Sequence, residues 1–248
     1  MSRFTRFLMM TMIASSTPAA GVVPAPHISV VVENVEHGSA IPAQQALCIA
    51  TANGKSEKIG KTIRPAIRWS GAPKDTKSFA VFIMATDAPA NFDDADKDGK
   101  TIPANARRQT LFHYGLVEIP ATVSMLSGGD ADESVLGTAL DNDIGMNSFE
   151  TQMGLYSLRP RERHLPSLSA YVGPCPPWND ERVHRYHYIV MALGGAAPVS
   201  VPNAVSSARP GDHSNNANRT YNRLVNSSHV LATGAVIGTY TLNPNLKP

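Results

Sequence analysis

Residues 78–85, with the sequence SFAVFIMA, form an unbroken apolar run with the length of one β-strand. Such a run, preceded by a Gly/Pro turn at 70–76 (SGAPKDT), is typical of a buried central strand. Two further apolar runs of strand length occur at 111–118 (LFHYGLVE) and 186–193 (YHYIVMAL). The sequence therefore predicts a fold that is built around buried β-strands.

Further segments extend the β pattern on both sides of these runs. Residues 27–35 (HISVVVENV) are rich in β-branched side chains, residues 64–69 (RPAIRW) alternate, and residues 235–242 (AVIGTYTL) again have strand composition. Strand follows strand without regular helical crossovers, which favours antiparallel pairing over a βαβ arrangement. We therefore predict a mainly β protein, an antiparallel β-sandwich.

One helix is predicted near the C-terminus, over residues 218–232, with Gly234 as its C-terminal stop. The residues expected to share one face of this helix are Tyr221, Leu224, Val225, Ser228 and Leu231. Two polar or irregular stretches, about 91–108 and 151–169, are predicted to be surface insertions. Because no boundary is visible, residues 22–248 are expected to form a single domain.

Residues 1–21 have the pattern of a secretory signal peptide. Arg3 and Arg6 precede a short apolar stretch at 7–14 (FLMMTMIA), and small residues follow at 19–21. We therefore expect the mature chain to be exported, to the periplasm or out of the cell. The alternative is that these residues form a native N-terminus.

The composition is that of an ordinary globular protein, with 42% hydrophobic and 17% charged residues among 248. Without Arg3 and Arg6 the chain has 20 basic and 20 acidic residues. A neutral chain lacks the basic footprint of nucleic-acid binding and the polybasic signal for anionic membranes. We therefore expect no nucleic acid as a partner. No run of eighteen apolar residues occurs, so no transmembrane anchor is expected either.

Cys48 and Cys175 are the two cysteines of the chain. In an exported protein two cysteines most simply form one disulfide bond, and the alternative is two separate buried thiols. Spacing alone does not decide between them, because a disulfide needs a suitable approach of the two Cα atoms.

Two of four segments that could form a site lie on the predicted strands. Asp87 is in the segment 86–89 (TDAP) at the end of the buried strand, where sites are often built. An Asp that caps a turn before Pro is the simpler interpretation. His113 interrupts the apolar run 111–118, and a single histidine in a strand is more often structural than functional.

The other two segments are a rigid loop and the start of a strand. Residues 171–177 (YVGPCPP) hold three prolines and one glycine. A loop this rigid can hold a site at little entropic cost, or can simply end a sheet. His184 and Tyr186 point to one face of a strand, whereas Arg185 points to the other face, free to form an ion pair.

Together these segments resemble the phosphatidylethanolamine-binding protein family, also called Raf kinase inhibitor-like proteins, and its bacterial branch in particular. They span most of the chain in order, interrupted by the two insertions. The matching segments are 63–73, 76–79, TDAP at 86–89, FHYGLVEIP at 112–120, GMNSF at 145–149, YVGPCPP at 171–177, HRY at 184–186, 229–232 and 238–240. The resemblance implies an antiparallel β-sandwich with a small anion pocket near the surface.

In that family the pocket takes phosphate, acetate or a phosphorylated headgroup. The ligand-binding residues that the resemblance implies here are Asp87, Pro89, His113, Gly173, Cys175, Pro176, His184 and Tyr186. Imidazole, hydroxyl and backbone N–H groups that converge on one point can bind an anion. A pair of histidines would make that binding sensitive to pH near about 6–7.

One departure from the family pattern concerns the pocket wall. The family usually has Asp-Pro-Asp-Ala-Pro where this chain has Ala85, Thr86 and then Asp-Ala-Pro. The missing carboxylate would accept an ammonium group or pair with a pocket histidine. Its loss weakens the case for phosphoethanolamine and favours an anion. In addition, Glu118 stands where the family strand commonly has Asn.

Asp94, Asp96 and Asp98 precede Gly99 in the pattern D-x-D-x-D-G, which matches the first half of a calcium loop. An EF-hand would continue to a Glu where this chain has Asn105, and no flanking helices are evident. The pattern therefore leaves two interpretations, a weak Ca²⁺ site and a solvated acidic loop.

No sequence motif of a serine hydrolase, zinc protease or phosphate-binding loop is present. Asp87, His113 and His184 could form a facial triad of metal ligands, but the resemblance favours an anion at that place. We therefore predict a non-catalytic binding protein for phosphate or a phosphorylated or lipid-like headgroup, which inhibits a partner kinase or protease. The alternatives are a protein-interaction module that uses its insertions, and a minor hydrolase activity.

Overall fold

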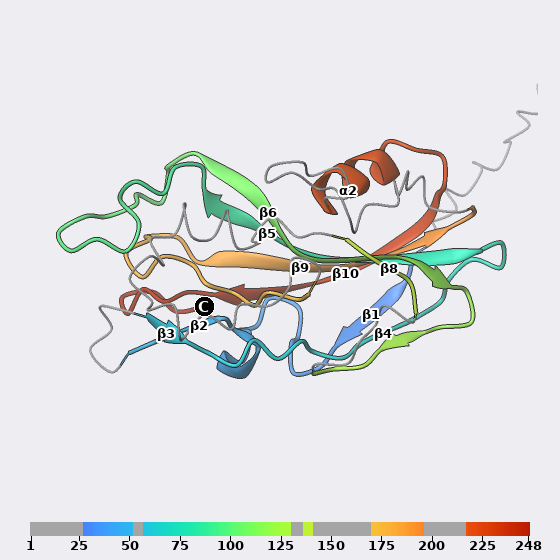
Figure 1. Cartoon of the computed structure of the whole chain (residues 1–248), viewed down its shortest axis with the longest axis horizontal. Helices are drawn as coiled ribbons and strands as arrows, with labels where there is room; N and C mark the ends of the chain where they lie inside the picture. Colours follow the sequence, from blue (N-terminus) through green and yellow to red (C-terminus); the bar gives the residue numbers. More distant parts are fainter. Residues whose placement is uncertain (1–26, 52–56, 130–135, 141–169, 196–216) are drawn as a thin grey trace, which may run out of the picture.

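Five antiparallel strands form the central sheet, in the order β10-β9-β5-β6-β8 (Figure 1). Their bounds are Ser78–Pro89 for β5, Arg108–Pro120 for β6, Thr138–Ala139 for β8, His184–Leu193 for β9 and Val230–Tyr240 for β10. The computed structural model describes residues 27–51, 57–129, 136–140, 170–195 and 217–248.

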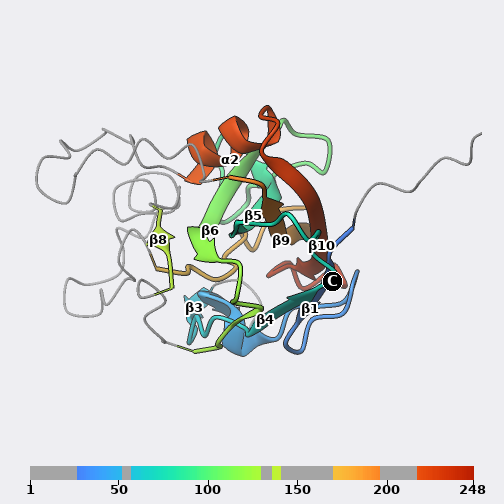
Figure 2. The ribbon, with the colours of Figure 1, turned by 90° about the vertical axis from the view of Figure 1, so that its right-hand side faces the viewer.

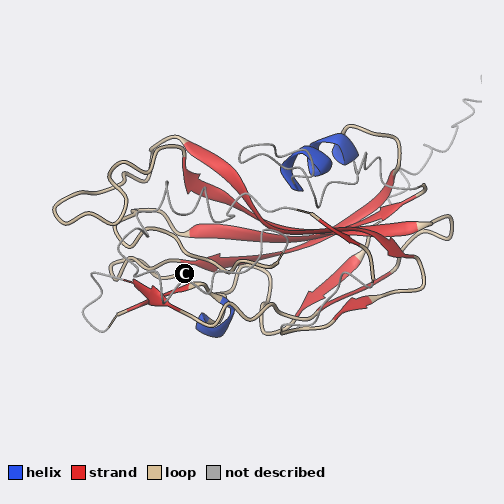
Figure 3. Cartoon of the chain, viewed as in Figure 1, coloured by secondary structure: helices blue, strands red, loops and turns tan. Residues whose placement is uncertain are grey.

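A second layer of short strands covers one face of the central sheet, and helix α2 (Ala217–Val225) lies on the other face (Figures 1 and 2). The short strands form a three-stranded sheet, β1-β4-β7, and a two-stranded sheet, β2-β3. Their bounds are Ser29–Val32 for β1, Cys48–Ala50 for β2, Glu57–Ile59 for β3, Ile67–Ser70 for β4 and Met125–Leu126 for β7, with a 3₁₀ turn η1 at Ala43–Gln45. Figure 3 shows how strongly strands dominate this arrangement.

Alternating side chains of the central strands fill two separate cores. On β9, Tyr188 and Val190 pack between the central sheet and the short strands, whereas Ile189 and Met191 pack beneath α2. Both faces of β5 are covered in the same way, and residues 78–85 are buried throughout. The mainly β, antiparallel sandwich with a C-terminal helix is therefore confirmed, as is the buried central strand.

The predicted helix over 218–232 is too long, because α2 ends at Val225 and β10 begins at Val230. The Ser227 side chain and backbone N–H both donate to the Leu224 carbonyl oxygen, which closes the last turn. Beyond that turn the chain pairs with β9 as far as Tyr240. Gly234 is therefore a strand residue, and a Cβ there would lie 2.0 Å from the carbonyl oxygen of Ile28.

The first predicted insertion connects β5 to β6 and ends one residue earlier than expected, since Arg108 already belongs to β6. The second, 151–169, and the predicted leader, 1–21, lie outside the described residues. Within the described part of the chain, no helix combines the length and apolar character needed to cross a membrane.

Candidate functional site

A small pocket lies where the ends of β5, β6 and β9 meet the loop 171–177. Its cavity volume is about 20 Å³, counted as the space that the centre of a water molecule can occupy. This is enough for one small group. The residues that line it are Ala85, Ala88, Pro89, Phe92, Leu111, His113, Cys175, Pro176, Pro177, His184 and Tyr186. Among these described residues only two imidazoles and one phenol carry polar side-chain atoms, and no Asp, Glu, Lys or Arg is present.

His113 reaches the pocket from an irregular point of β6. Tyr114 pairs with Ile83 and Phe112 pairs with Met84, so the register shifts at His113 as in a β-bulge. Bulges commonly change the direction of a side chain beside a site. The Nδ1 of His113 lies 2.7 Å from the carbonyl oxygen of Val172, which only accepts, so this nitrogen carries the proton. The other ring nitrogen, Nε2, is left for a ligand.

The buried position of His113 keeps its imidazole neutral. Burial and, to a lesser extent, nearby His184 lower the pKa of His113 to about 4, although its hydrogen bonds to the backbone of Val172 and Gly173 act in the opposite direction. Its ring also packs edge-on against Tyr186, with ring centroids 5.1 Å apart. Burial raises the pKa of Tyr186 well above its usual range, so its hydroxyl stays neutral.

His184 is oriented by a carboxylate behind the pocket wall. Its Nε2 lies 2.9 Å from Oδ2 of Asp180, which is itself buried. Arg108 holds the same carboxylate with two hydrogen bonds, one of them 2.9 Å from Nη2 to Oδ1. Burial alone would raise the pKa of Asp180, but the hydrogen bonds from His184 and Arg108 lower it overall. The ionised Asp180 therefore fixes the ring of His184 and leaves its Nδ1 for the pocket.

Asp87 does not line the pocket, because arginine side chains hold it elsewhere. Arg185 donates from Nε to Oδ2 at 2.8 Å and from Nη2 to Oδ1 at 3.0 Å, and Arg182 adds a bond of 3.2 Å. Burial alone would raise the pKa of Asp87, but the bonds and charge of Arg185 lower it to about 2. The predicted ion pair of Arg185 is therefore confirmed, and its partner is a residue that was itself expected in the pocket.

Gly173 also lies behind the pocket rather than on its surface. A Cβ at this position would lie 2.1 Å from the carbonyl oxygen of Gln45, so only glycine lets the loop pack this closely. Its backbone N–H donates to the hydroxyl of Thr62 at 2.7 Å. The structure thus gives Gly173 a packing position next to the site.

A disulfide bond ties the pocket loop to the short-strand layer. It joins Cys48 of β2 to Cys175, which lines the pocket. Tyr240 of β10 also holds Cys48 in position, because its hydroxyl donates to the Cys48 carbonyl oxygen at 2.9 Å. The expected pairing of the two cysteines is confirmed. A stable disulfide is typical of oxidising compartments.

The structure brings together six of the eight residues expected at the pocket: Pro89, His113, Cys175, Pro176, His184 and Tyr186. Sequence reasoning did not identify Ala88, Phe92, Leu111 and Pro177 as lining residues, nor Asp180 and Arg108 as supports of His184. The only available signal for Asp180 was an acidic residue four positions before a site histidine. Ala85 lines the pocket, so the wall lacks a carboxylate at this position.

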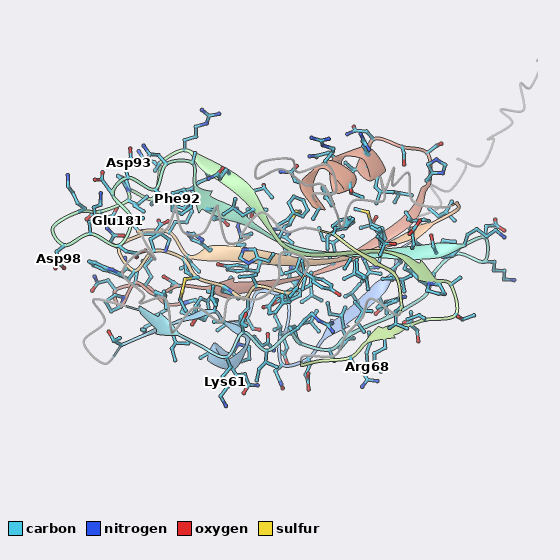
Figure 4. All side chains as sticks on the ribbon, in the orientation of Figure 1. Lys61, Arg68, Phe92, Asp93, Asp98 and Glu181 are labelled. Carbon is cyan, nitrogen blue, oxygen red and sulfur yellow. A yellow bond between two sulfur atoms is a disulfide. The ribbon has the colours of Figure 1, made fainter. Side chains whose placement is uncertain are left out.

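The acidic loop uses two of its three aspartates for internal contacts. An Asp96 carboxylate oxygen accepts the backbone N–H of Trp178 at 2.8 Å, and Asp94 lies 3.5 Å from the ammonium of Lys100. Asp98 is exposed and lies at the far end of the loop (Figure 4). No group of three His, Cys, Asp or Glu side chains in the described segments is placed to hold a metal ion. Calcium binding stays a prediction that this geometry does not support.

These features define a β-sandwich protein with one narrow pocket lined by histidine and tyrosine. The family model described as Phosphatidylethanolamine-binding protein matches residues 32–241, so the chain belongs to the phosphatidylethanolamine-binding protein family. Membership supports a ligand-binding, non-catalytic protein in general.

Individual relatives agree with this assignment. The UPF0098 protein YbcL of Escherichia coli (strain K12) is 29% identical over 136 residues, which are 54% of this chain and 54% of that protein. The chain therefore matches about half the length of this curated relative.

Two solved structures are also similar. The putative phosphatidylethanolamine-binding protein homolog CT736 from Chlamydia trachomatis D/UW-3/CX has a TM-score of 0.51 at 16% identity. The crystal structure of Escherichia coli YbcL has a TM-score of 0.48 at 20% identity. In each case the match covers 87% of this chain and 98% of the other. At this identity the first likeness supports the fold alone.

Proposed function

We propose that the pocket binds a small anion, phosphate or the phosphate of a phosphorylated headgroup, reversibly and without turnover. The observation that carries this proposal is the polar lining of the pocket, which consists of two oriented imidazoles and one hydroxyl with no carboxylate among the described residues. Because Ala85 stands where the family usually has Asp, the pocket wall lacks the carboxylate that would repel an anion or attract an ammonium group. Export to an oxidising compartment belongs to the same proposal and is supported by the disulfide.

The protonation states indicate how such an anion would be held. With Nδ1–H of His113 given to Val172, its neutral Nε2 accepts rather than donates. An anion therefore either brings a proton of its own, as a protonated phosphate does, or induces His113 to take one up. In the second case the affinity rises as the pH falls, because the bound state holds one proton more than the free protein and free anion. In the first case it rises only over the pH range in which the free anion still lacks that proton.

A thermal-shift titration of the mature chain tests this proposal. Phosphate, phosphoethanolamine and Ca²⁺ are compared on the wild type, His113→Gln and His184→Gln. At 100 times its dissociation constant a ligand adds about 2.7 kcal/mol, which is about 5–11 °C for a chain of this size. We expect phosphate to stabilise the wild type and to have little effect on either pocket variant.

His187→Gln is the matched control, because His187 lies on the same strand but outside the pocket lining. Stabilisation by phosphate that survives both pocket variants would refute the site. Stabilisation by Ca²⁺ alone would favour the acidic loop. Hydrolysis of a phosphate ester that is lost in His113→Gln would favour the hydrolase alternative.

Inhibition of a partner kinase or protease is a further part of the proposal, based on the family resemblance. A pull-down with wild type and His113→Gln tests whether the pocket takes part. Equal capture by both proteins would assign partner binding to other surfaces, such as the loop 91–107.

A further inference from the structure

A second cleft, separate from the anion pocket, lies between three loops at the same end of the molecule. Residues 100–104, 178–181 and 243–246 form its walls, and they share no lining residue with the pocket. Figure 4 labels Glu181, one of the residues that line this cleft. The cleft encloses about 560 Å³, within the range of sites that hold small molecules.

Hydrogen bonds of the buried Asn179 side chain hold the first two walls in place. The amide nitrogen of Asn179 donates to the carbonyl oxygens of Asp94 at 2.8 Å and Lys100 at 3.0 Å. Its amide oxygen accepts the backbone N–H of Asp96 at 2.9 Å. The backbone N–H of Ile102 donates to the carbonyl oxygen of Asn179 at 3.1 Å, and the carbonyl oxygen of Ile102 accepts the backbone N–H of Glu181 at 3.0 Å.

The third wall, the C-terminal segment, is held by Asn243. Its buried side chain donates to the carbonyl oxygen of Asp180 at 2.8 Å and accepts the backbone N–H of Asn245 at 3.0 Å. All three walls are therefore fixed before any ligand arrives. A preformed cleft loses little conformational entropy on binding.

The charges along the cleft nearly cancel. Lys100 and Glu181 are the two charged residues of its lining, and Lys100 already lies 3.5 Å from the Asp94 carboxylate. A lining with one charge of each sign gives no net attraction to an anion or to a cation. This balance favours a neutral ligand and separates the cleft from the proposed anion pocket.

The remaining lining combines an aromatic ring with hydrogen-bonding groups. Trp178 and Leu246 are both partly exposed and both line the cleft. Thr101 and Asn245 are exposed, and a hydroxyl and an amide can each both donate and accept. A sugar ring has the matching surface, with apolar C–H faces and a rim of hydroxyls that donate and accept.

We propose that this cleft binds a neutral carbohydrate, with Trp178 as the stacking platform and Thr101 and Asn245 as hydrogen-bond partners. A peptide ligand fits this cleft less well. Peptides are commonly held along a sheet edge or as a helix in an apolar groove. The three walls here lie outside the strands and helices of the described chain, so neither mode is offered.

Titration with neutral oligosaccharides tests the proposal, using maltotriose, cellotriose and N,N′,N″-triacetylchitotriose as probes. The chain has two tryptophans, and Trp69 is buried at 5% exposure, so a change in emission is expected from Trp178. We expect at least one trisaccharide to shift the fluorescence of the wild type and of Trp69→Phe. By calorimetry, Trp178→Ala should weaken that binding at least about tenfold.

Two further variants make the outcome specific. His113→Gln should keep the saccharide affinity, so that failure of the anion pocket and failure of the cleft can be told apart. Asn245→Ala should weaken saccharide binding and leave phosphate binding unchanged. The proposal is overturned if no trisaccharide binds at millimolar concentration, or if Trp178→Ala binds as well as the wild type. It is also overturned if Trp178-dependent binding is found for peptides and not for sugars.

Discussion

His113 links the stability of the fold to pH, because its imidazole is buried and no carboxylate of the described residues pairs with it. Its pKa falls from 6.5 to about 4 in the folded protein, mainly through burial. Below pH 6.5 the unfolded chain takes up this proton, while the folded chain resists it until about pH 4. The contribution to stability is therefore complete above pH 6.5 and is lost as the pH falls toward 4.

The size of this contribution follows from the pKa difference. A difference of about 2.5 pKa units at about 1.4 kcal/mol each corresponds to roughly 3 kcal/mol. For a chain of this size, that loss lowers the Tm by about 6–12 °C. Removing the imidazole should remove this dependence without touching the carboxylates of Asp87 and Asp180, whose pKa values are lowered and which act at lower pH.

Urea unfolding at several pH values between 7 and 4 measures the effect on wild type and His113→Gln. Glutamine can still donate to the Val172 carbonyl oxygen. We expect the variant to be less stable at pH 7 and the gap to shrink by roughly 3 kcal/mol toward pH 4. His187→Gln is the control, since the pKa of His187 is also lowered by burial but its ring is only partly buried.

A constant gap between wild type and His113→Gln across this range would refute the reasoning. It would mean that the folded protein accommodates the imidazolium as easily as water does. Protonation of His113 also gives a prediction for the pH dependence of phosphate binding. Phosphate affinity should rise from pH 7 to pH 5 in the wild type, and this rise should be absent in His113→Gln.

Three further substitutions test other parts of the site. Replacing Cys48 and Cys175 by Ser opens a link across 127 positions and should cost about 5 kcal/mol by chain entropy, visible as a lower Tm that reductant also produces in the wild type. Gly173→Ala should destabilise by about 1–3 kcal/mol, measured by urea unfolding, because the added methyl meets backbone atoms of Gln45. Ala85→Asp should abolish phosphate stabilisation in thermal shift, because it places a carboxylate in the pocket wall.

The long strands could be predicted because each contains enough residues to show a pattern. Residues 79–85 are apolar throughout, and residues 78–85 are covered on both faces. In contrast, β7 and β8 have two residues each, and β2 and β3 have three, which is too few for a periodicity. These short strands form because they pair with neighbouring strands in the folded protein.

The C-terminal helix shows how tertiary pairing also overrides a local pattern. Leu231 fits the helical spacing that begins at Tyr221, but it lies in β10, which pairs with β9. Ten residues of β10 pair with the central strand β9, with Leu231 at a register shift between Val230 and Ala232, and this pairing outweighs one more helical turn at the surface. The sequence alone does not contain this comparison.

The sequence predicted the residue types of the candidate site better than it predicted which way their side chains point. Register shifts in the β5–β6 pair fall at His113 and between Ala85 and Ala88, next to Asp87. A bulge changes which side chains face a pocket, and alternation along the strand does not predict it. The family resemblance implied Asp87 as a pocket residue, and it is found with Arg185 instead.

The carboxylates of Asp87 and Asp180, which lie near the pocket, are paired with other side chains outside the pocket lining. Asp87 faces Arg185 and Arg182, and Asp180 faces Arg108 and the far side of His184. Neither lines the pocket, so neither presents a negative charge directly to a ligand there.

With Ala85 in the wall, the charge inside the pocket depends on whether its imidazoles are protonated. The acidic residues around this site then act by orienting His184 and by fixing the strand ends, rather than by contacting a ligand. The anion binding that we propose for this pocket would then gain affinity by the uptake of a proton. Proton uptake on binding is therefore the property that would distinguish it most directly from a pocket with a carboxylate in its wall.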